Sequence, residues 1–360
     1  MNVNRILELE QADAVHSLQG FLANWWEAYE LEALLAPAEV ADRDLIGTRV
    51  IQDPSGLETV NPFAPIMLSN AARTADRYIQ EHPSQRVGVI LRPCELRVYT
   101  ELRKRRSDPV DDSQAVIIGI DCLGTFLPEN YRQNVEQRGA ETILTETLVN
   151  AAEGGLRPQP FRTACQICDW PAPRGADLSI GTIGVNSTQL LLLVARDEET
   201  DARLGLPDLT NHLATEYQVS HRETVVGAIA DMRAAIRKNM VEELATSRHF
   251  GDLGSLLAWL ANCDLCGKCL NACPLYDGEL DVLLGKPHPR HAERAPLAEL
   301  VSVSRWLVSC GGCGMCEESC DQGVPLILLI SALSHRIQGD LHYTSGDASK
   351  RLPWMSDSAH

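Results

Sequence analysis

The feature that most constrains this chain is a cysteine run that occurs twice in its C-terminal third. Each run has the spacing C-x2-C-x2-C-x3-C, and the first continues with Pro274 where the second has Asp321. The first run contains Cys263, Cys266, Cys269 and Cys273, and the second contains Cys310, Cys313, Cys316 and Cys320. Three closely spaced thiolates on a tight loop can reach three corners of one metal cluster, but the fourth corner must be reached from elsewhere. The spacing therefore predicts that each run folds around metal.

The repeated spacing is typical of iron–sulfur ligation. In two-cluster ferredoxins, three thiolates of a C-x2-C-x2-C-x3-C run bind one [4Fe–4S] cluster and the fourth binds the cluster of the other run. The crossed sets are Cys263, Cys266, Cys269 and Cys320, and Cys310, Cys313, Cys316 and Cys273. Gly267, Gly311, Gly312 and Gly314 lie in these loops and permit close approach of backbone N–H groups to cluster sulfurs. Zinc is the alternative, but zinc sites commonly use two separated C-x2-C pairs.

The remaining cysteines are sufficient for one further cluster. They are Cys94, Cys122, Cys165 and Cys168. The apolar runs 87–91 and 115–120 predict buried strands, with a helix over 95–106 between them. Strands joined through a helix are parallel, so their carboxyl ends meet at one edge of the sheet. Cys94 and Cys122 follow these two ends and are expected to meet there, where the C-x2-C pair completes the set.

Two simpler interpretations of these four cysteines stay open. A lone buried cysteine is most often a small packed residue without chemistry. The pair Cys165 and Cys168 also matches a thioredoxin-like redox motif, although it follows no obvious strand. A third [4Fe–4S] cluster is favoured because these cysteines make one complete ligand set.

The pattern divides the chain into two units and a tail. Residues 1–250 predict an α/β domain with a parallel strand pair, and residues 251–340 predict a mainly α-helical domain of the ferredoxin type. Residues 341–360 contain four Ser and two Asp, and they predict a mobile tail unless a partner holds it.

Helical periodicity indicates which faces are buried. Two stripes in the first unit are interpreted as core: Val15, Leu18, Leu22, Trp25 and Tyr29, and Ile229, Met232, Ile236 and Met240. In the second unit, Asp252 can cap one helix and residues 299–308 form a second candidate. Pro325 opens a third helix through Leu333. The prolines and charges of residues 278–296 predict an exposed connector.

Composition excludes several function classes. Asp and Glu number 49 against 32 Lys and Arg, and the net charge of −17 argues against binding nucleic acid. No apolar run approaches the ~20 residues of a membrane span, and acidic residues interrupt anything resembling a secretion signal near the N-terminus. We therefore expect a cytoplasmic chain that is not transmembrane, whose 12 cysteines serve as metal ligands or redox centres. Motifs of hydrolases and phosphate-binding loops are absent from the sequence.

Three segments resemble, in order and spacing, the beta subunit family of coenzyme F420-reducing hydrogenase and formate dehydrogenase. They are Arg92–Arg97 (RPCELR), Gly119–Gly124 (GIDCLG) and Cys165–Gly184. This resemblance extends over about residues 15–248. Residues 252–337 resemble the α-helical ferredoxins of heterodisulfide reductase and succinate dehydrogenase iron–sulfur subunits. The formate dehydrogenase beta subunit also carries a ferredoxin segment after its first domain, so the order of the units favours that branch.

The resemblance implies cofactors and partners. Family members are expected to hold a [4Fe–4S] cluster at the four cysteines of the first unit, beside a flavin. Flavin-binding members usually begin with a glycine pair, which this chain lacks, so Gly181 and Gly184 remain the candidate residues for FAD. The expected cofactors are three [4Fe–4S] clusters, with FAD as a further candidate.

The resulting hypothesis is an iron–sulfur electron-transfer subunit of a hetero-oligomeric oxidoreductase. It would relay electrons between a catalytic subunit, first a formate dehydrogenase alpha subunit and second a hydrogenase, and a second electron acceptor protein. No residue is predicted to be catalytic. The alternative is a flavin subunit that itself reduces F420 or a nicotinamide, because flavin converts one-electron flow into hydride transfer. A cluster-stabilised assembly scaffold is the third interpretation.

Overall fold

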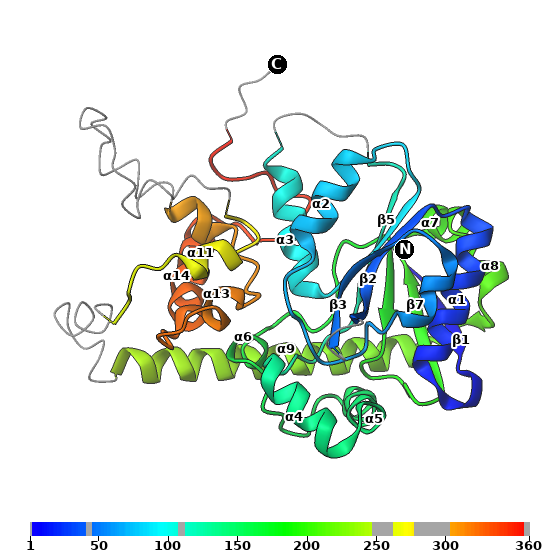
Figure 1. Cartoon of the computed structure of the whole chain (residues 1–360), viewed down its shortest axis with the longest axis horizontal. Helices are drawn as coiled ribbons and strands as arrows, with labels where there is room; N and C mark the ends of the chain where they lie inside the picture. The colour runs from blue at the N-terminus through cyan, green and yellow to red at the C-terminus, as the bar shows by residue number, and fades with distance from the viewer. Residues whose placement is uncertain (1, 41–44, 107–111, 247–261, 277–302, 356–360) are drawn as a thin grey trace.

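The computed structural model describes residues 2–40, 45–106, 112–246, 262–276 and 303–355. A larger unit contains a β-sheet with helices around it, and a smaller helical unit lies beside it (Figure 1). The long helix α9 (Glu216–Thr246) runs along the base of both units (Figure 1). No helix among the described residues combines the length and the apolar character needed to cross a bilayer.

Eight strands of the described chain form one sheet in the order β3-β2-β4-β5-β6-β7-β1-β8. Their bounds are β1 Val3–Glu8, β2 Ala33–Val40, β3 Leu45–Ile51, β4 Val87–Leu91, β5 Ala115–Ile120, β6 Leu178–Gly181, β7 Leu190–Ala195 and β8 His212–Leu213. Strands β2, β4, β5 and β6 are parallel neighbours, and the outer pairs are antiparallel. The parallel centre of the sheet brings the ends of four strands to one edge.

The helices of the larger unit follow or connect these strands. They are α1 Ala14–Tyr29, α2 Ala72–Glu81, α3 Pro93–Lys104, α4 Pro128–Arg138, α5 Ala140–Ala152, α6 Thr163–Gln166, α7 Glu198–Arg203 and α8 Leu206–Leu209, in addition to α9; two short 3-10 helices are Glu10–Ala12 and Pro54–Thr59. The stripe predicted in α1 is core, because Leu18, Leu22 and Trp25 are buried, while Val15 and Tyr29 pack against the same cluster.

The parallel pair β4 and β5 confirms the sequence prediction for this part of the sheet. Val87 pairs with Ala115, and the ladder continues to Leu91. Helix α3 begins at Pro93, whose fixed φ suits a first helical position. The buried Glu95 carboxylate accepts hydrogen bonds from the backbone N–H of Arg92 (2.9 Å) and of Ala71 (3.0 Å). The start of α3 is thereby fixed directly after β4.

Helix α9 joins the two units through its buried face. Ile229 belongs to the core of the larger unit, whereas Ile236 and Met240 pack against residues of α6 and of α14 (Leu326–Asp340). The prediction that Met232 shares this face is wrong, because 42% of Met232 is exposed. Arg233 occupies the buried position instead, and its guanidinium reaches backbone carbonyl groups beneath the helix.

The helical unit contains α11 Lys268–Ala272, α13 Met315–Glu318 and α14 Leu326–Asp340. Pro325 precedes α14 as the sequence predicts, and the helix continues beyond Leu333 to Asp340. Residues 303–308 are helical, in agreement with the second half of the candidate over 299–308. The helix expected after Asp252 and the connector 278–296 lie outside the described residues.

The expectation of a mobile tail differs from the structure over residues 341–355. The Tyr343 hydroxyl donates to the buried Glu101 carboxylate of α3, at 2.6 Å from Oε1 and 2.8 Å from Oε2. The backbone N–H of Gly346 donates to the same carboxylate (2.8 Å), and Leu352 is buried. A buried carboxylate needs such donors, so it holds the C-terminal segment against α3.

Candidate metal centres

The first group of cysteines, here called the sheet-edge set, lies at the carboxyl ends of the parallel strands. It contains Cys94, Cys122, Cys165 and Cys168. Cys94 is the second residue of α3, directly after β4, and Cys122 follows β5 by two residues. Helix α6 and the residues just after it supply Cys165 and Cys168. The fold therefore gathers three distant chain segments at one edge.

The cysteines of the sheet-edge set are partly buried, and their thiols lie near enough to raise one another's pKa values. Burial raises the pKa of Cys122 to about 11, and the neighbouring Cys165 and Cys168 thiolates add to the rise. Burial also raises the pKa of Cys94 well above its usual value, with contributions from Glu95, Cys313 and the thiolates of its own set. A metal cation bound by all of these thiolates would offset their mutual repulsion.

Polar groups also converge on individual sulfurs of this set. The backbone N–H of Thr125 donates to Cys165 Sγ at 3.4 Å, and the Thr125 hydroxyl lies 3.7 Å from the same sulfur. Hydrogen bonds to cluster-ligating sulfur raise the reduction potential because they stabilise negative charge.

Buried arginines surround the sheet-edge set, and sequence reasoning missed them. Arg92 and Arg233 both oppose the rise in the pKa of Cys122 through their positive charge. Burial by itself lowers the pKa of Arg162, but the Cys165 thiolate and Glu318 outweigh burial and raise it overall. An arginine two residues before Cys94 and another three before Cys165 were visible in the sequence, but their burial was not.

The second group, here called the middle set, combines the last cysteine of the first run with three of the second. It contains Cys273, Cys310, Cys313 and Cys316. Burial raises the pKa of Cys310 to about 11 and that of Cys313 to about 12, and Cys273 contributes to both rises. Burial is the largest cause of the raised pKa of Cys316, and the thiolates of Cys313, Cys310 and Cys273 raise it further.

Two N–H donors reach sulfurs of the middle set. The indole Nε1 of Trp306 donates to Cys273 Sγ at 3.2 Å, and the backbone N–H of Gly312 donates to Cys310 Sγ at 3.4 Å. Gly312 and Gly314 have positive φ values of 71° and 73°. Glycine adopts this conformation without strain, so the loop can turn its N–H groups toward the sulfurs.

The third group, here called the outer set, lies at the surface. It contains Cys263, Cys266, Cys269 and Cys320, of which the first two are exposed. Burial raises the pKa of Cys269, and the thiolates of Cys263, Cys320 and Cys266 raise it further. The structure thus places Cys320 beside the first run and Cys273 beside the second, which is the crossed arrangement expected for two ferredoxin-type clusters.

The loops of the sheet-edge and middle sets press against each other. A Cβ on Gly311 would lie 2.4 Å from Val98 Cγ2 and 3.2 Å from the carbonyl oxygen of Cys94. A Cβ on Gly314 would lie 2.5 Å from Ala164 Cβ in α6. Both approaches require glycine, so these residues bring the two sets of thiols close together.

The spacing of the thiols bears on the kind of metal centre. A tetrahedral zinc site holds its sulfurs about 3.8 Å apart, because each Zn–S bond is about 2.3 Å. Within the described ranges, no three Cys, His, Asp or Glu side chains are arranged to hold one metal ion. In a cubane each thiolate binds a different iron, so its sulfurs lie farther apart. Neighbouring thiols with buried cations and N–H donors fit such a cluster.

The Gly181–Gly184 turn is the predicted flavin site, but the backbone N–H groups inside it donate to a carboxylate of the protein. The Asp121 carboxylate accepts hydrogen bonds from the N–H groups of Thr182 (2.8 Å) and Ile183 (2.9 Å). Arg222 of α9 donates to the same carboxylate, with Nη2 2.7 Å from Oδ1. An aspartate therefore occupies the place that a flavin phosphate would take at this turn.

The two glycines of this turn are explained by helix packing. A Cβ on Gly181 would lie 2.9 Å from the guanidinium carbon of Arg222, and one on Gly184 would lie 2.9 Å from Val225 Cβ. Gly184 also has a positive φ of 67°. The expectation of a flavin site at Gly181 and Gly184 finds no support in this geometry.

These cysteine sets define an iron–sulfur protein of the electron-transfer class. Residues 84–204 match the family of coenzyme F420 hydrogenase/dehydrogenase beta subunits, in the C-terminal part of that family's sequence. Residues 259–324 match the family described as "4Fe-4S dicluster domain". The chain is thus similar over these two segments to the F420 hydrogenase/dehydrogenase beta subunits and to 4Fe–4S dicluster domains.

A similar solved chain comes from the F420-reducing [NiFe] hydrogenase complex of Methanosarcina barkeri. It is 12% identical, and the match covers 71% of the present chain and 94% of that chain with a TM-score of 0.48. A likeness at this level establishes neither a shared fold nor a shared activity.

Proposed function

We propose that this chain is a three-cluster electron relay within an oxidoreductase complex. The sheet-edge, middle and outer sets each hold one [4Fe–4S] cluster, and electrons pass through them in that spatial order. The observation that carries the proposal is the contact between the sheet-edge and middle loops at Gly311 and Gly314. Cys94 and Cys313 lie close enough for their thiolates to repel one another.

The two ends of the relay differ in exposure, which suggests how partners use them. Cys263 and Cys266 of the outer set are exposed, so a protein partner can approach this cluster directly. None of the four sheet-edge cysteines is fully exposed, and buried arginines lie near them. Electron exchange with another protein is therefore assigned to the outer end of the relay.

The described residues serve electron transfer, and the substrate chemistry is assigned to a partner subunit. Bound clusters would exchange single electrons, while the surrounding arginines and N–H donors stabilise the added charge. The family match fits either a dehydrogenase or a hydrogenase. The order of the two segments places a formate dehydrogenase catalytic subunit first among the candidate partners and a hydrogenase second. We expect a hetero-oligomer in which this chain links that subunit to a second electron acceptor.

A second candidate function is supported by a cavity of about 490 Å³ lined in part by residues of β6, β7 and α9. Its walls include Ser179, Arg174, Arg196 and the segment that follows Trp170. Arg174 stacks on the Trp170 ring at 4.5 Å from its centroid, which links the cavity to the Cys168 loop. A cavity of this size suits a cofactor, so a flavin that passes hydride to F420 or a nicotinamide is the alternative end of the relay.

Anaerobic purification of the native complex tests these proposals. Formate-dependent dye reduction by a complex containing this chain, with about 12 iron atoms per chain, supports the relay in formate dehydrogenase. Hydrogen-dependent reduction supports the hydrogenase candidate. Bound flavin with F420 reduction supports the second function. A chain that purifies alone with clusters that cannot be reduced contradicts both functions and favours the scaffold.

A further inference from the structure

Arg97 is a buried cation that forms no ion pair within the described part of the chain, although its charge interacts with the nearby Asp169 carboxylate. The residue is only 9% exposed. Its Nε has no hydrogen-bond partner among the described residues, and no carboxylate in that part of the chain forms an ion pair with the guanidinium. Burial of an unpaired charge is costly, so such groups normally face a compensating charge. The position of Arg97 shows where this compensating charge belongs.

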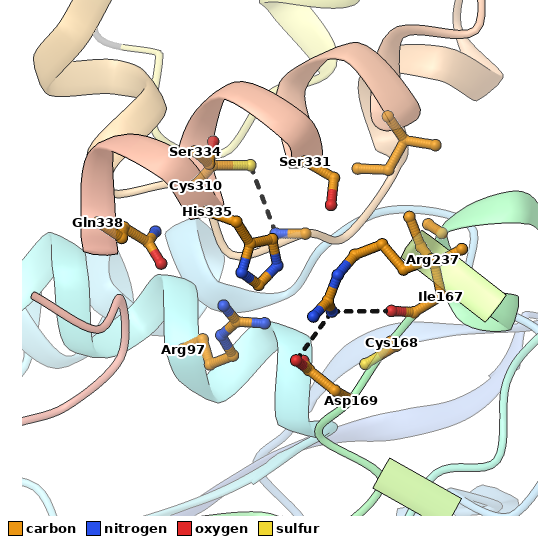
Figure 2. Close-up of a pocket in the computed structure, with 13 residues that line it drawn as sticks. Arg97, Ile167, Cys168, Asp169, Arg237, Cys310, Ser331, Ser334, His335 and Gln338 are labelled. Carbon is orange, nitrogen blue, oxygen red and sulfur yellow. Dashed lines mark hydrogen bonds and ion pairs between the residues drawn. The ribbon is translucent and has the colours of Figure 1, made fainter. Parts of the chain in front are cut away.

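The Arg97 guanidinium points into a small cavity between the sheet-edge and middle sets (Figure 2). The cavity has a volume of about 40 Å³, and Cys168 of one set and Cys310 of the other both line it. A Cβ on Gly312, in the loop of the middle set, would lie 3.7 Å from Arg97 Nη1. The guanidinium also lies over the Trp170 ring, with its carbon 4.7 Å from the centroid.

Carboxylates near this cavity are committed to other partners. Asp169 lies on the cavity wall, but its Oδ2 accepts a hydrogen bond from Arg237 Nη1 at 2.8 Å (Figure 2). Glu95 accepts two backbone N–H groups at the start of α3. Glu101 is satisfied by Tyr343, Lys104 and Gly346. The cavity wall therefore keeps an excess of positive charge beside the thiols of two sets.

The position of Arg97 relates it to two of the three thiol sets. Its side chain shares a cavity wall with Cys168 of the sheet-edge set and with Cys310 of the middle set. Among the described residues, the cavity lining includes no cysteine of the outer set.

We propose that Arg97 is the shared counter-ion of two iron–sulfur clusters and raises the reduction potentials of both. This inference rests on the proposed three-cluster function. A cation between two clusters stabilises the reduced, more negative form of each cluster. Both reduction potentials rise together, so electrons can pass between the two clusters. Arg97 thus acts on the clusters through its charge and does not bind iron.

Redox titration of the anaerobically purified full chain, followed by electron paramagnetic resonance, tests the proposal. We expect Arg97→Gln to lower the potentials of the sheet-edge and middle clusters together and to leave the outer cluster unchanged. Arg97→Lys, which keeps the charge, should return both potentials toward the wild type. The matched control is Arg103→Gln, because Arg103 lies on the same helix, is half-exposed and pairs with Asp112; all three potentials should then stay at their wild-type values.

The outcomes separate this inference from the function on which it rests. A wild-type chain with about eight iron atoms contradicts the three-cluster relay before Arg97 is tested. A chain with about 12 iron atoms whose potentials are unchanged in Arg97→Gln overturns the role of Arg97 and leaves the relay intact. Should Arg97→Gln lose its clusters, Arg97→Lys decides: iron retained at wild-type potentials supports the charge role, and iron lost again assigns Arg97 to packing.

Discussion

The outer and sheet-edge sets contain the same number of thiols but are assembled by different parts of the fold. The outer set takes three cysteines from seven consecutive residues, 263–269, and one from the second run. The sheet-edge set collects single cysteines that follow two strands and a pair beyond a helical segment. A short loop therefore leaves two of its cysteines exposed, whereas all four cysteines at the sheet edge are partly buried.

The environments of the two sets differ as much as their construction in the chain. The sheet-edge thiols lie among Arg92, Arg97, Arg162 and Arg233, all of which are buried. The outer set has Lys268 nearby, which is exposed and pairs with Asp321. Charge in a buried site is weakly screened by solvent and therefore acts strongly on a cluster. Within the proposed relay, this difference assigns partner contact to the outer set and electrostatic tuning by the protein to the sheet-edge set.

Removal of all iron is expected to have the largest effect on folding. It should unfold the helical unit and leave the sheet of the larger unit folded. The larger unit has an extensive apolar core around its sheet, but the core of the helical unit includes thiol-bearing residues such as Cys316. Metal binding commonly supplies folding free energy in small domains of this kind. Chelation should therefore abolish amide-exchange protection in residues 262–276 and 303–340 while the β4 and β5 strands stay protected. Equal loss in both regions would contradict the distinction.

The substitution Cys122→Ser examines the sheet-edge set directly. It should reduce the iron content from about 12 to about eight atoms per chain, since one cubane of four is lost. Signals of the two remaining clusters should persist, because neither ferredoxin-type set includes this residue. Iron analysis with electron paramagnetic resonance provides the measurement. An unchanged iron content would show that Cys122 is a structural cysteine.

A matched pair of substitutions sharpens the boundary between the outer and middle sets. Cys320→Ser should damage the cluster held by Cys263, Cys266 and Cys269, and Cys273→Ser should damage the other ferredoxin-type cluster. The positions of these cysteines agree with this expectation. Cys320 lies near enough to Cys269 to raise its pKa, and Cys273 does the same for Cys316. Comparison of the resonance spectra of the two variants identifies the lost cluster. The reverse result would establish uncrossed ligation.

The smallest effect is expected at the C-terminal segment. Tyr343→Phe removes a hydroxyl that donates to Glu101, while Lys104 and Gly346 still satisfy the carboxylate. Opening of residues 341–355 should become easier by about 1 kcal/mol, the net value of one hydrogen bond. Amide exchange of this segment measures the change, and Ser349→Ala, at an exposed turn, is the control. Protection identical to the wild type would mean that Tyr343 does not hold the segment.

Some features of the fold followed directly from local sequence. The predicted strands 87–91 and 115–120 match β4 and β5 in the structure, because short β-branched runs bounded by turns have few other stable arrangements. The core stripe of α1 followed from its 3.6-residue period in the same way. Periodicity was insufficient in α9, where Arg233 rather than Met232 is buried because it reaches the carbonyls of Leu123 and Cys168.

What the sequence determined by itself is the number and the spacing of the cysteines, since ligand spacing is a property of the chain that any fold must respect. Only the tertiary structure decided the surroundings of those thiols. The burial of Arg97, the use of the Gly181–Gly184 turn by Asp121 and the docking of Tyr343 on Glu101 all join residues far apart in the chain. Such contacts depend on which surfaces the packed sheet and helices bring together, and burial then determines how strongly each charge acts.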